Sequence, residues 1–398
     1  MKLHGKALVA AMCVGQIGNL LPHVAVPAIM AQHLMPEWHL SATEAGMMAS
    51  SFAFGYMVAV PVLTTLTDRI DARRILFAGS ALSGLATLAF GFLADDLSAV
   101  IWWTLAGIGF AGAYMPGLKA LTDRLEPGDS SRSVTLYTSS FSFGVGISFL
   151  VAQLAADLLG WRYAFVMTAF GPILMIAACL MMAPHHPPPT QSRLTDFSPV
   201  FRNRAALGYI FGYGAHCFEL YGIRTWIVGF WTFVAAQNAG SAIPGPIAVS
   251  VMFTILAMPS SILGNELAIR FGRHRAIGLV MAGSALAAVL IALFAGQSAW
   301  LLLGLILVYA FTVNADSGAL TSGMTLSADP NFRGATMALH STVGFGLSAL
   351  GAWGVGVAID TAGGPASTSG WVAGFGLLAL GIAFGPLALL WSRGRAKP

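Results

Sequence analysis

His216, Glu219 and Arg224 lie near the middle of an apolar stretch, residues 207–233, with the sequence LGYIFGYGAHCFELYGIRTWIVGFWTF. This stretch is long enough to cross a bilayer, because about 20 helical residues span a hydrocarbon core of ~30 Å. A charge at that depth costs at least ~2.5 kcal/mol, so such residues usually face a bundle interior or a water-filled cavity. Helical spacing places His216 and Glu219 on one face. We predict that this helix lines a polar path through a membrane.

Two acidic residues in predicted membrane helices, Glu219 and Asp316, are candidates for proton coupling. A carboxyl group whose surroundings change between two conformations binds a proton in one and releases it in the other. His216 is a candidate relay, since an ordinary imidazole has a pKa of ~6.5. The alternative is permanent pairing, in which Glu219 binds His216 or Arg224, and His216 only positions Glu219. Asp316 would then pair with Asn314 or with a facing helix.

The composition identifies an integral membrane protein. Hydrophobic residues make up 57% of the 398 residues and charged residues only 9%, whereas soluble domains average ~25% charged residues. The lipid bilayer is therefore a predicted partner. Cys13, Cys179 and Cys217 fall in predicted spans without paired metal spacing and are interpreted as buried apolar residues.

Apolar windows of 20 or more residues predict an all-α membrane protein with twelve transmembrane helices. Their expected ranges are 7–30, 44–66, 73–93, 97–122, 131–157, 161–183, 204–234, 245–269, 274–295, 299–325, 333–359 and 368–392. A Pro-rich polar segment separates the sixth helix from the seventh. We therefore predict a six-helix bundle over residues 1–183, a cytoplasmic linker over 184–203 and a second six-helix bundle over 204–398.

The basic residues predict the orientation. All 20 Lys and Arg residues except Arg162 and Arg224 fall in the termini or in loops on one side of the predicted topology. Basic loops stay in the cytoplasm, so both termini and the linker are predicted to be cytoplasmic. The predicted location is the plasma membrane, or the inner membrane in a Gram-negative bacterium. This distribution also accounts for the net positive charge without nucleic acid as a partner.

The two halves repeat one another. The segment AGSAL occurs at residues 78–82 and again at 282–286, and Arg132 and Arg333 open helices five and eleven at nearly the same offset. Repeated halves often enclose a site near the membrane midplane, which predicts pseudo-symmetric bundles.

The segment TTLTDRIDARR, residues 64–74, resembles the cytoplasmic loop signature G-x-x-x-D-R-x-G-R-R of the major facilitator superfamily, with Thr64 and Asp71 in place of its glycines. Gly160-Trp161-Arg162-x-x-Phe165 is similar to the start of helix six in that superfamily. The resemblance covers the whole chain and implies a secondary transporter.

The resemblance also implies a conformational gate. In that family the loop acid latches the cytoplasmic side, a role that falls on Asp68 here, with Arg69 and Arg73 as supporting charges. The second copy of the loop supplies Arg270 and Arg273. The alternative is that these charges only fix the topology.

In that family, helices one, four, seven and ten line the substrate cavity. A guanidinium such as Arg224 suits a carboxylate or a phosphate-like group. The remaining predicted substrate-binding residues are Gln16, Asn19 and His23, spaced i, i+3, i+7 along helix one, with Tyr114, Tyr221 and Asn314. A core stripe that satisfies its own hydrogen bonds would give the same pattern.

The predicted function is proton-coupled uptake of a small polar or anionic solute by alternating access of the two halves. The alternative is a proton-coupled exporter of amphipathic or toxic compounds, although helix five lacks the Gly-Pro pair typical of the drug-antiporter branch. No P-loop, zinc-ligand spacing or Ser/His/Asp arrangement predicts an enzyme, and no cofactor is expected. A sensor would be expected to carry an added cytoplasmic domain. We expect a monomer.

Overall fold

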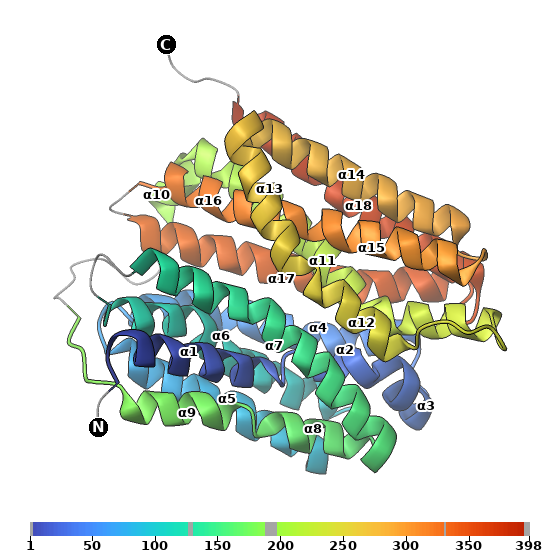
Figure 1. The fold of residues 1–398 in the computed structure, drawn as a ribbon, viewed down its shortest axis with the longest axis horizontal. Helices are drawn as coiled ribbons and strands as arrows, with labels where there is room; N and C mark the ends of the chain where they lie inside the picture. Colours follow the sequence, from blue (N-terminus) through green and yellow to red (C-terminus); the bar gives the residue numbers. More distant parts are fainter. Residues whose placement is uncertain (1–2, 126–129, 188–196, 330–331, 394–398) are drawn as a thin grey trace. The chain divides into compact units, whose positions relative to one another are not determined.

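The computed structural model describes residues 3–125, 130–187, 197–329 and 332–393, and within these ranges the regular elements are helices (Figure 1). An isolated parallel bridge joins Leu3 and Met182. The middle of the predicted linker, residues 188–196, lies outside the described residues, as do Lys2, Arg395 and Lys397.

The chain divides into two compact units. The first contains Met1–Ile29 and Ser51–Asp196, and the second contains Met30–Ser50 and Phe197–Pro398. The chain passes between the units at three places, and one of these, between Ser50 and Ser51, falls within helix α4 (Ala42–Leu66). The predicted bundles over 1–183 and 204–398 remain a prediction.

The first unit packs α5 against α6 and α8, and α1 against α7 and α9 (Figure 1). Besides the part of α4 from Ser51 on, the helices of this unit are α1 (Gly5–Leu20), α2 (Ala25–Ile29), α5 (Ala72–Leu93), α6 (Ala99–Thr122), α7 (Ser130–Leu159), α8 (Trp161–Ala169) and α9 (Pro172–Met181).

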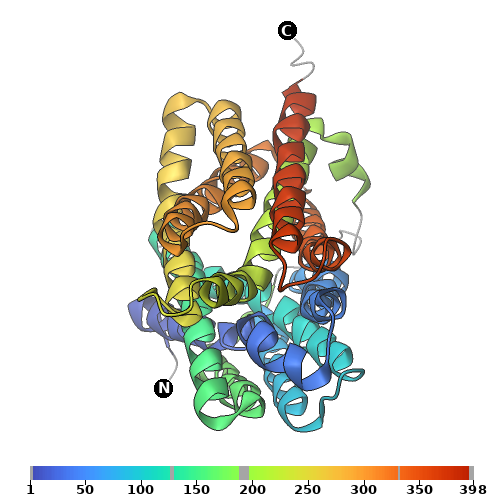
Figure 2. The same cartoon turned by 90° about the vertical axis from the view of Figure 1, so that its right-hand side faces the viewer.

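The second unit is built around α11 (Arg204–Gln237), which packs against α17 and α18 (Figure 2). Asn203 begins this helix, because its side chain accepts a hydrogen bond from the backbone N–H of Ala206 at 3.1 Å. The other helices are η1 (Met30–Leu34), α3 (Met35–Trp38), α10 (Ser198–Arg202), α12 (Pro246–Ile255), α13 (Ala257–Phe271), α14 (Arg273–Phe294), α15 (Ala299–Ala315), α16 (Ser317–Ser327), α17 (Arg333–Thr361) and α18 (Thr368–Arg393).

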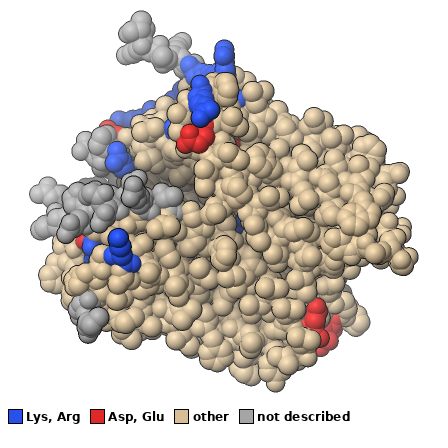
Figure 3. All heavy atoms as spheres, viewed as in Figure 1, with Lys and Arg blue, Asp and Glu red and all other residues tan. Residues whose placement is uncertain are grey.

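Among the described residues, ten helical segments are long and apolar enough to cross a membrane, or eleven if the bent pair α1 and α2–α3 is one span. Helix α11 lies where the seventh span was predicted but is not among them. Large apolar side chains face outward, such as Leu279 at 74% exposure, and few charged side chains interrupt the face shown in Figure 3. The chain is therefore a multi-pass membrane protein, and the count of twelve stays a prediction.

The first predicted helix, residues 7–30, is not continuous. It breaks between Leu20 and Ala25, where the segments on either side are bent by 50°. Pro22 lies in the break and has no N–H for a helical hydrogen bond. The turn is closed by short bonds, from His23 N–H to the Leu20 carbonyl and from Ala25 N–H to the Pro22 carbonyl, each at 3.0 Å.

Three further predicted helices also contain breaks, between α8 and α9, between α12 and α13, and between α15 and α16. The last break places Asp316 between two helices inside one candidate span. Here α13 approaches closely, because a Cβ added to Gly264 would lie 1.7 Å from the Ala315 carbonyl oxygen. Glycine at this position lets α13 pack against the break.

We expect Gly264→Ala to displace the backbone at Ala315 and to lower the thermal unfolding temperature of the detergent-purified protein, at a cost of about 1–3 kcal/mol for overpacking. Gly304→Ala is the matched control, since a Cβ there meets nothing within 4 Å. This control is expected to be neutral or to stabilise the helix by up to ~1 kcal/mol. Equal unfolding temperatures for Gly264→Ala and the wild type would contradict the proposed close contact.

Candidate functional site

The three ionisable residues in the middle of α11 are all buried. His216 is 2% exposed, Glu219 0% and Arg224 5%. Each belongs to the second unit, and each has a different environment within it. A buried ionisable group needs a partner or a function.

His216 meets Asp316 across the break between α15 and α16. The His216 Nδ1 and Asp316 Oδ1 atoms are 2.7 Å apart, and both side chains are 2% exposed. The two atoms are within ion-pair distance but lack the alignment of a hydrogen bond. The neighbouring Asn314 donates instead to the Ala310 carbonyl of its own helix, at 2.8 Å. Asp316 is thus held by the facing helix and not by Asn314.

Glu219 contacts neither of the partners that helical spacing offers. Its Oε1 accepts a hydrogen bond from the Ser284 hydroxyl of α14 at 2.8 Å, whereas Oε2 has no hydrogen-bond partner among the described residues. Glu219 and Asp316 therefore make different contacts. Glu219 bonds a neutral hydroxyl, and Asp316 meets an imidazole.

Arg224 lies over the ring of Tyr221, with its guanidinium carbon 5.1 Å from the ring centroid. Its Nε atom is buried and has no hydrogen-bond partner among the described residues. Tyr221 in turn contacts Phe345 of α17, with ring centroids 5.5 Å apart. The result is a cation with free donor capacity beside aromatic rings.

The polar residues predicted for helix one lie in the first unit, and all are buried. Gln16 Oε1 accepts a hydrogen bond from the Tyr137 hydroxyl at 2.9 Å, whereas both side-chain polar atoms of Asn19 lack a partner among the described residues. His23 lies in the turn after α1, so the predicted stripe does not follow one continuous helix. The ring of His23 contacts Phe110, and Tyr114 stacks on the same phenylalanine.

The predicted gate residue Asp68 lies in the loop between α4 and α5, 3.9 Å from Lys119. Burial raises the pKa of Asp68, although Lys119 lowers it in part. Arg69 and Arg270 are exposed. Arg273 begins α14 and has a buried Nη1 without a hydrogen-bond partner among the described residues.

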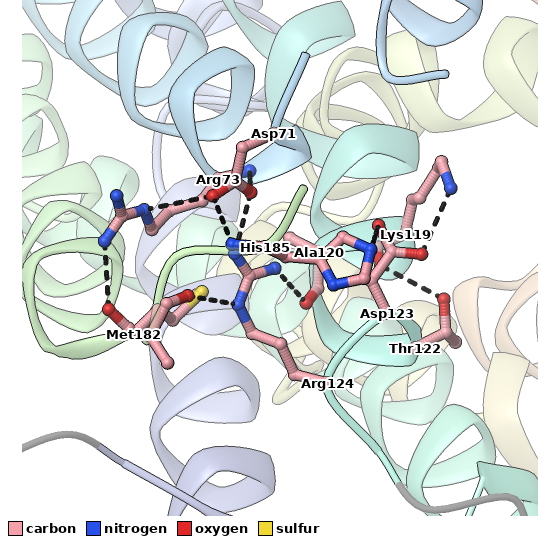
Figure 4. A network of polar contacts seen from close by, with 10 residues as sticks. Asp71, Arg73, Lys119, Ala120, Thr122, Asp123, Arg124, Met182 and His185 are labelled. Carbon is pink, nitrogen blue, oxygen red and sulfur yellow. Dashed lines mark hydrogen bonds and ion pairs between the residues drawn. The ribbon is translucent and has the colours of Figure 1, made fainter. Parts of the chain in front are cut away.

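Asp71, which replaces a glycine of the family signature, is the centre of a polar network beside this loop (Figure 4). Its Oδ1 accepts from Arg124 Nη2 at 2.7 Å and from the backbone N–H of Arg73 at 2.9 Å. Its Oδ2 accepts from the backbone N–H of His185 at 3.0 Å. Asp71 therefore begins α5 as an N-cap and binds the segment that follows α9.

The two arginines bind the same segment. Arg73 Nη1 donates to the Met182 carbonyl at 2.9 Å, and Arg124 Nε donates to the Ala183 carbonyl at 2.8 Å. Burial alone would raise the pKa of Asp71, but the hydrogen bonds from Arg124, His185 and Arg73 together lower it. The first residues of the predicted linker are thus fixed to the first unit.

The sequence interpretation missed Asp71 and Arg124 as partners. A signal was present, because an aspartate directly before a helix is a preferred N-cap. Arg73 was predicted to support Asp68, but its contacts are with Met182 and, at 3.6 Å, with Asp71.

The fold thus combines apolar candidate spans with buried ionisable side chains. This combination is typical of membrane proteins that bind polar groups or ions. The sequence profile of the Major Facilitator Superfamily matches residues 10–352. The chain belongs to this superfamily.

Several characterised relatives are similar over part of the chain. The benzoate transport protein of Acinetobacter baylyi is 26% identical over 149 residues, which cover 36% of this chain and 32% of that protein. Protein spinster homolog 1 of Bos taurus is 21% identical over 291 residues, covering 68% and 55%. A probable sulfoacetate transporter of Cupriavidus necator is 24% identical over 139 residues, covering 35% and 32%. The chain thus matches about a third to about half of each relative's length.

The fold is also that of solved transporters. A bacterial homolog of the human lysosomal transporter spinster, in an inward-facing and unoccupied conformation, superposes with a TM-score of 0.74 at 16% identity, over 97% of this chain and 96% of that chain. At this identity the likeness shows a shared fold.

We expect Asp71→Asn to lower the unfolding temperature at neutral pH, at a cost of about 1–3 kcal/mol, because Arg124 then keeps a buried charge without its carboxylate. The folded-state pKa of Asp71 is lowered, so its stabilisation is complete above the unfolded pKa of ~3.9 and is lost as the pH falls through the folded value. The difference from the wild type should therefore shrink in acid, as measured by thermal unfolding between pH 7 and pH 3.

Asp96→Asn is the control for this series, because Asp96 is exposed in the loop before α6 and such substitutions usually stay within ~0.5 kcal/mol. A difference between Asp71→Asn and the wild type that stays constant down to pH 3 would contradict the charge-based account.

Proposed function

We propose that this transporter carries a small organic anion into the cell together with protons, by alternating access. The observation that carries the proposal is Arg224, a buried cation on α11 that forms no ion pair with any described carboxylate. A buried unpaired charge is costly. An anionic substrate would compensate that charge when it binds.

The surroundings of Arg224 favour an anion with an apolar body. The guanidinium supplies donors for a carboxylate or sulfonate, and Tyr221 and Phe345 supply aromatic surface beside it. Two relatives are named for transport of benzoate and sulfoacetate, both small organic anions. These names support the substrate class, although each match covers only about a third of the relative.

The proposed proton-coupling residues are Asp316, His216 and Glu219. The contact between His216 and Asp316 joins α11 to the break between α15 and α16. A rearrangement at that break would separate imidazole from carboxylate and change the affinity of both for a proton. Glu219 offers a second carboxyl, which accepts a hydrogen bond from Ser284.

A second candidate is the exporter of amphipathic or toxic compounds. Stacked aromatic rings beside a buried polar cluster also suit an amphipathic ligand, and Tyr213, Tyr221 and Phe345 provide such rings. An amphipathic cation would repel Arg224, so the charge of the ligand distinguishes the two functions. Both proposed functions share a monomeric state and a plasma-membrane location with cytoplasmic termini. Both also share a conformational gate formed by Asp68, Arg69, Arg73, Arg270 and Arg273.

We expect benzoate or sulfoacetate at about 100 times its dissociation constant to raise the unfolding temperature of the purified protein by a few degrees, because a ligand that binds the folded state adds about 2.7 kcal/mol there. Arg224→Gln should weaken this binding about 10–100-fold through loss of charge-assisted hydrogen bonds. Arg162→Gln is the matched control, since Arg162 also lies over an aromatic ring, that of Trp161 at 4.4 Å. Stabilisation by sphingosine alone, insensitive to Arg224→Gln, would favour the exporter.

We expect Asp316→Asn and Glu219→Gln to abolish anion accumulation driven by a pH gradient in proteoliposomes, because neither variant can exchange a proton. Counterflow of labelled anion at equal pH on both sides should persist, since it needs no net proton movement. Ser284→Ala controls for local packing around Glu219. Normal gradient-driven accumulation in either variant would remove that carboxyl from the coupling mechanism.

A further inference from the structure

The carboxylate of Asp360, in the last turn of α17, binds the beginning of α4. Its Oδ1 accepts a hydrogen bond from the backbone N–H of Ala42 at 3.1 Å, and its Oδ2 accepts one from the backbone N–H of Thr43 at 2.6 Å. Both partners belong to the second unit, whereas α4 continues from Ser51 into the first unit. Asp360 therefore fixes the beginning of a helix that the two units share.

This contact supplies what the local sequence of α4 lacks. The first N–H groups of a helix have no partner within the helix. Ser41 and Glu44 form a capping box, in which the Ser41 hydroxyl accepts from the Glu44 N–H at 3.2 Å and a Glu44 oxygen accepts from the Ser41 N–H at 2.9 Å. The N–H groups of Ala42 and Thr43 are bonded instead by Asp360, which is 318 and 317 positions away along the chain.

Helix α17 itself gives the Asp360 carboxylate no favourable partner. A negative charge is unfavourable near the C-terminus of a helix and favourable near an N-terminus. No Lys or Arg in the described part of the chain forms an ion pair with Asp360, and the carboxylate of Glu44 is close enough to repel it. The beginning of α4 is therefore the partner that stabilises this charge.

The two helices approach each other through small residues. A Cβ added to Gly356 of α17 would overlap the Ala42 carbonyl oxygen, and one added to Gly46 of α4 would lie 2.9 Å from the Ala352 carbonyl oxygen. The indole N–H of Trp226 in α11 donates to the same Ala352 carbonyl at 2.9 Å, so α17 is held in place from its other neighbour. Small residues let membrane helices approach closely.

A contact of this kind can separate at a modest cost. Asp360 and Thr43 are partly exposed, so water can solvate the carboxylate when the helices part. The remaining contact is between small residues, whose separation exposes little apolar surface. Contacts that are made in one conformation and broken in another are the basis of conformational gates.

We propose that Asp360 is a gating residue, whose carboxylate holds the beginning of α4 on α17 in this conformation and releases it in the alternative one. This inference rests on the proposed function, because it requires alternating access. The predicted gate residue Asp68 follows the other end of α4, so this helix carries one gate at each end. In the predicted topology, the Asp360 gate lies on the non-cytoplasmic side and controls entry of the anion.

The test measures how fast a maleimide labels Ala352→Cys in the detergent-purified full chain. Ala352 is 3% exposed and lies against α4, and Cys13, Cys179 and Cys217 are first replaced by alanine to remove background labelling. Asp360→Ala should raise the labelling rate about 10–100-fold, because losing two charge-assisted hydrogen bonds shifts the population toward the open form. Asp360→Glu keeps the charge and should restore part of the protection.

Glu44→Ala is the matched control. It removes the capping box at the beginning of α4, as Asp360→Ala removes the other cap, but the Glu44 bonds involve no other helix. We expect it to change the labelling rate less than ~3-fold. An equal acceleration in Glu44→Ala and Asp360→Ala would show that Asp360 only caps a helix, and an unchanged rate in Asp360→Ala would also overturn the gate.

Thermal unfolding shows whether each variant is folded under the labelling conditions. If Asp360→Ala is not folded, Asp360→Asn replaces it, since asparagine keeps the size and one acceptor oxygen. Its labelling rate should rise about 3–10-fold, and no rise would contradict the gate.

The labelling needs no transported substrate, so its outcome is separate from that of the proposed function. If neither benzoate nor sulfoacetate is transported, the proposed substrate class fails while the labelling still decides the role of Asp360. If an anion is transported, adding it should change the labelling rate of Ala352→Cys at least ~3-fold, because turnover opens the gate. An unchanged rate would show that the contact is permanent, and then only the role of Asp360 is wrong.

Discussion

The cost of an ionisable group inside a bilayer is the constraint on which the second unit depends. A charge at mid-depth costs at least ~2.5 kcal/mol, and α11 buries three ionisable residues inside this unit. His216 is compensated by Asp316 across a helix break, and Glu219 by a hydroxyl of α14. Arg224 lies over the ring of Tyr221 and forms no ion pair with a described carboxylate. The three environments are therefore unequal, and this difference supports the proposed division into coupling residues and a substrate-binding residue.

The break between α15 and α16 follows from the same constraint. A continuous helix would bury all of its backbone bonds, whereas a break exposes backbone groups that need partners. It also sets Asp316 apart from the regular surface of either helix, where it reaches His216. Helix α13 packs directly against the break, because Gly264 has no side chain to separate it from Ala315. The break therefore combines close packing of α13 at Ala315 with the ionic contact of Asp316 and His216.

The sequence predicted much of the fold, but not the partners of the buried polar residues. Hydropathy is a property of long segments, so the apolar spans and the family could be predicted. The break at Asp316 has no proline to mark it, and it was missed. Spacing gives the face of a helix but not the helix opposite, so neither the Ser284 partner of Glu219 nor the His216 partner of Asp316 could be predicted.

The repeated segment AGSAL shows why such pairings depend on tertiary context. In its first copy, the Ser80 hydroxyl donates to the Leu76 carbonyl of its own helix at 2.8 Å. In its second copy, the equivalent Ser284 donates to Glu219 at the same distance. The local sequence is identical, so the neighbouring helix determines which acceptor the serine hydroxyl bonds. The same short segment can therefore satisfy its own helix in one place and bind a carboxylate of another helix in a second place.

The polar groups around Asp71 and those between α11 and α17 differ in how fully their hydrogen bonds are satisfied. Around Asp71, both carboxylate oxygens accept hydrogen bonds, and the arginines also hold backbone carbonyls. Such a saturated network stabilises one arrangement and has little capacity left for a ligand. Between α11 and α17, Arg224 and His340 keep unused donors in a buried setting. Unsatisfied buried polar groups lower the stability of a folded protein. Under the proposed function, a substrate that supplied the missing hydrogen bonds would recover that free energy on binding.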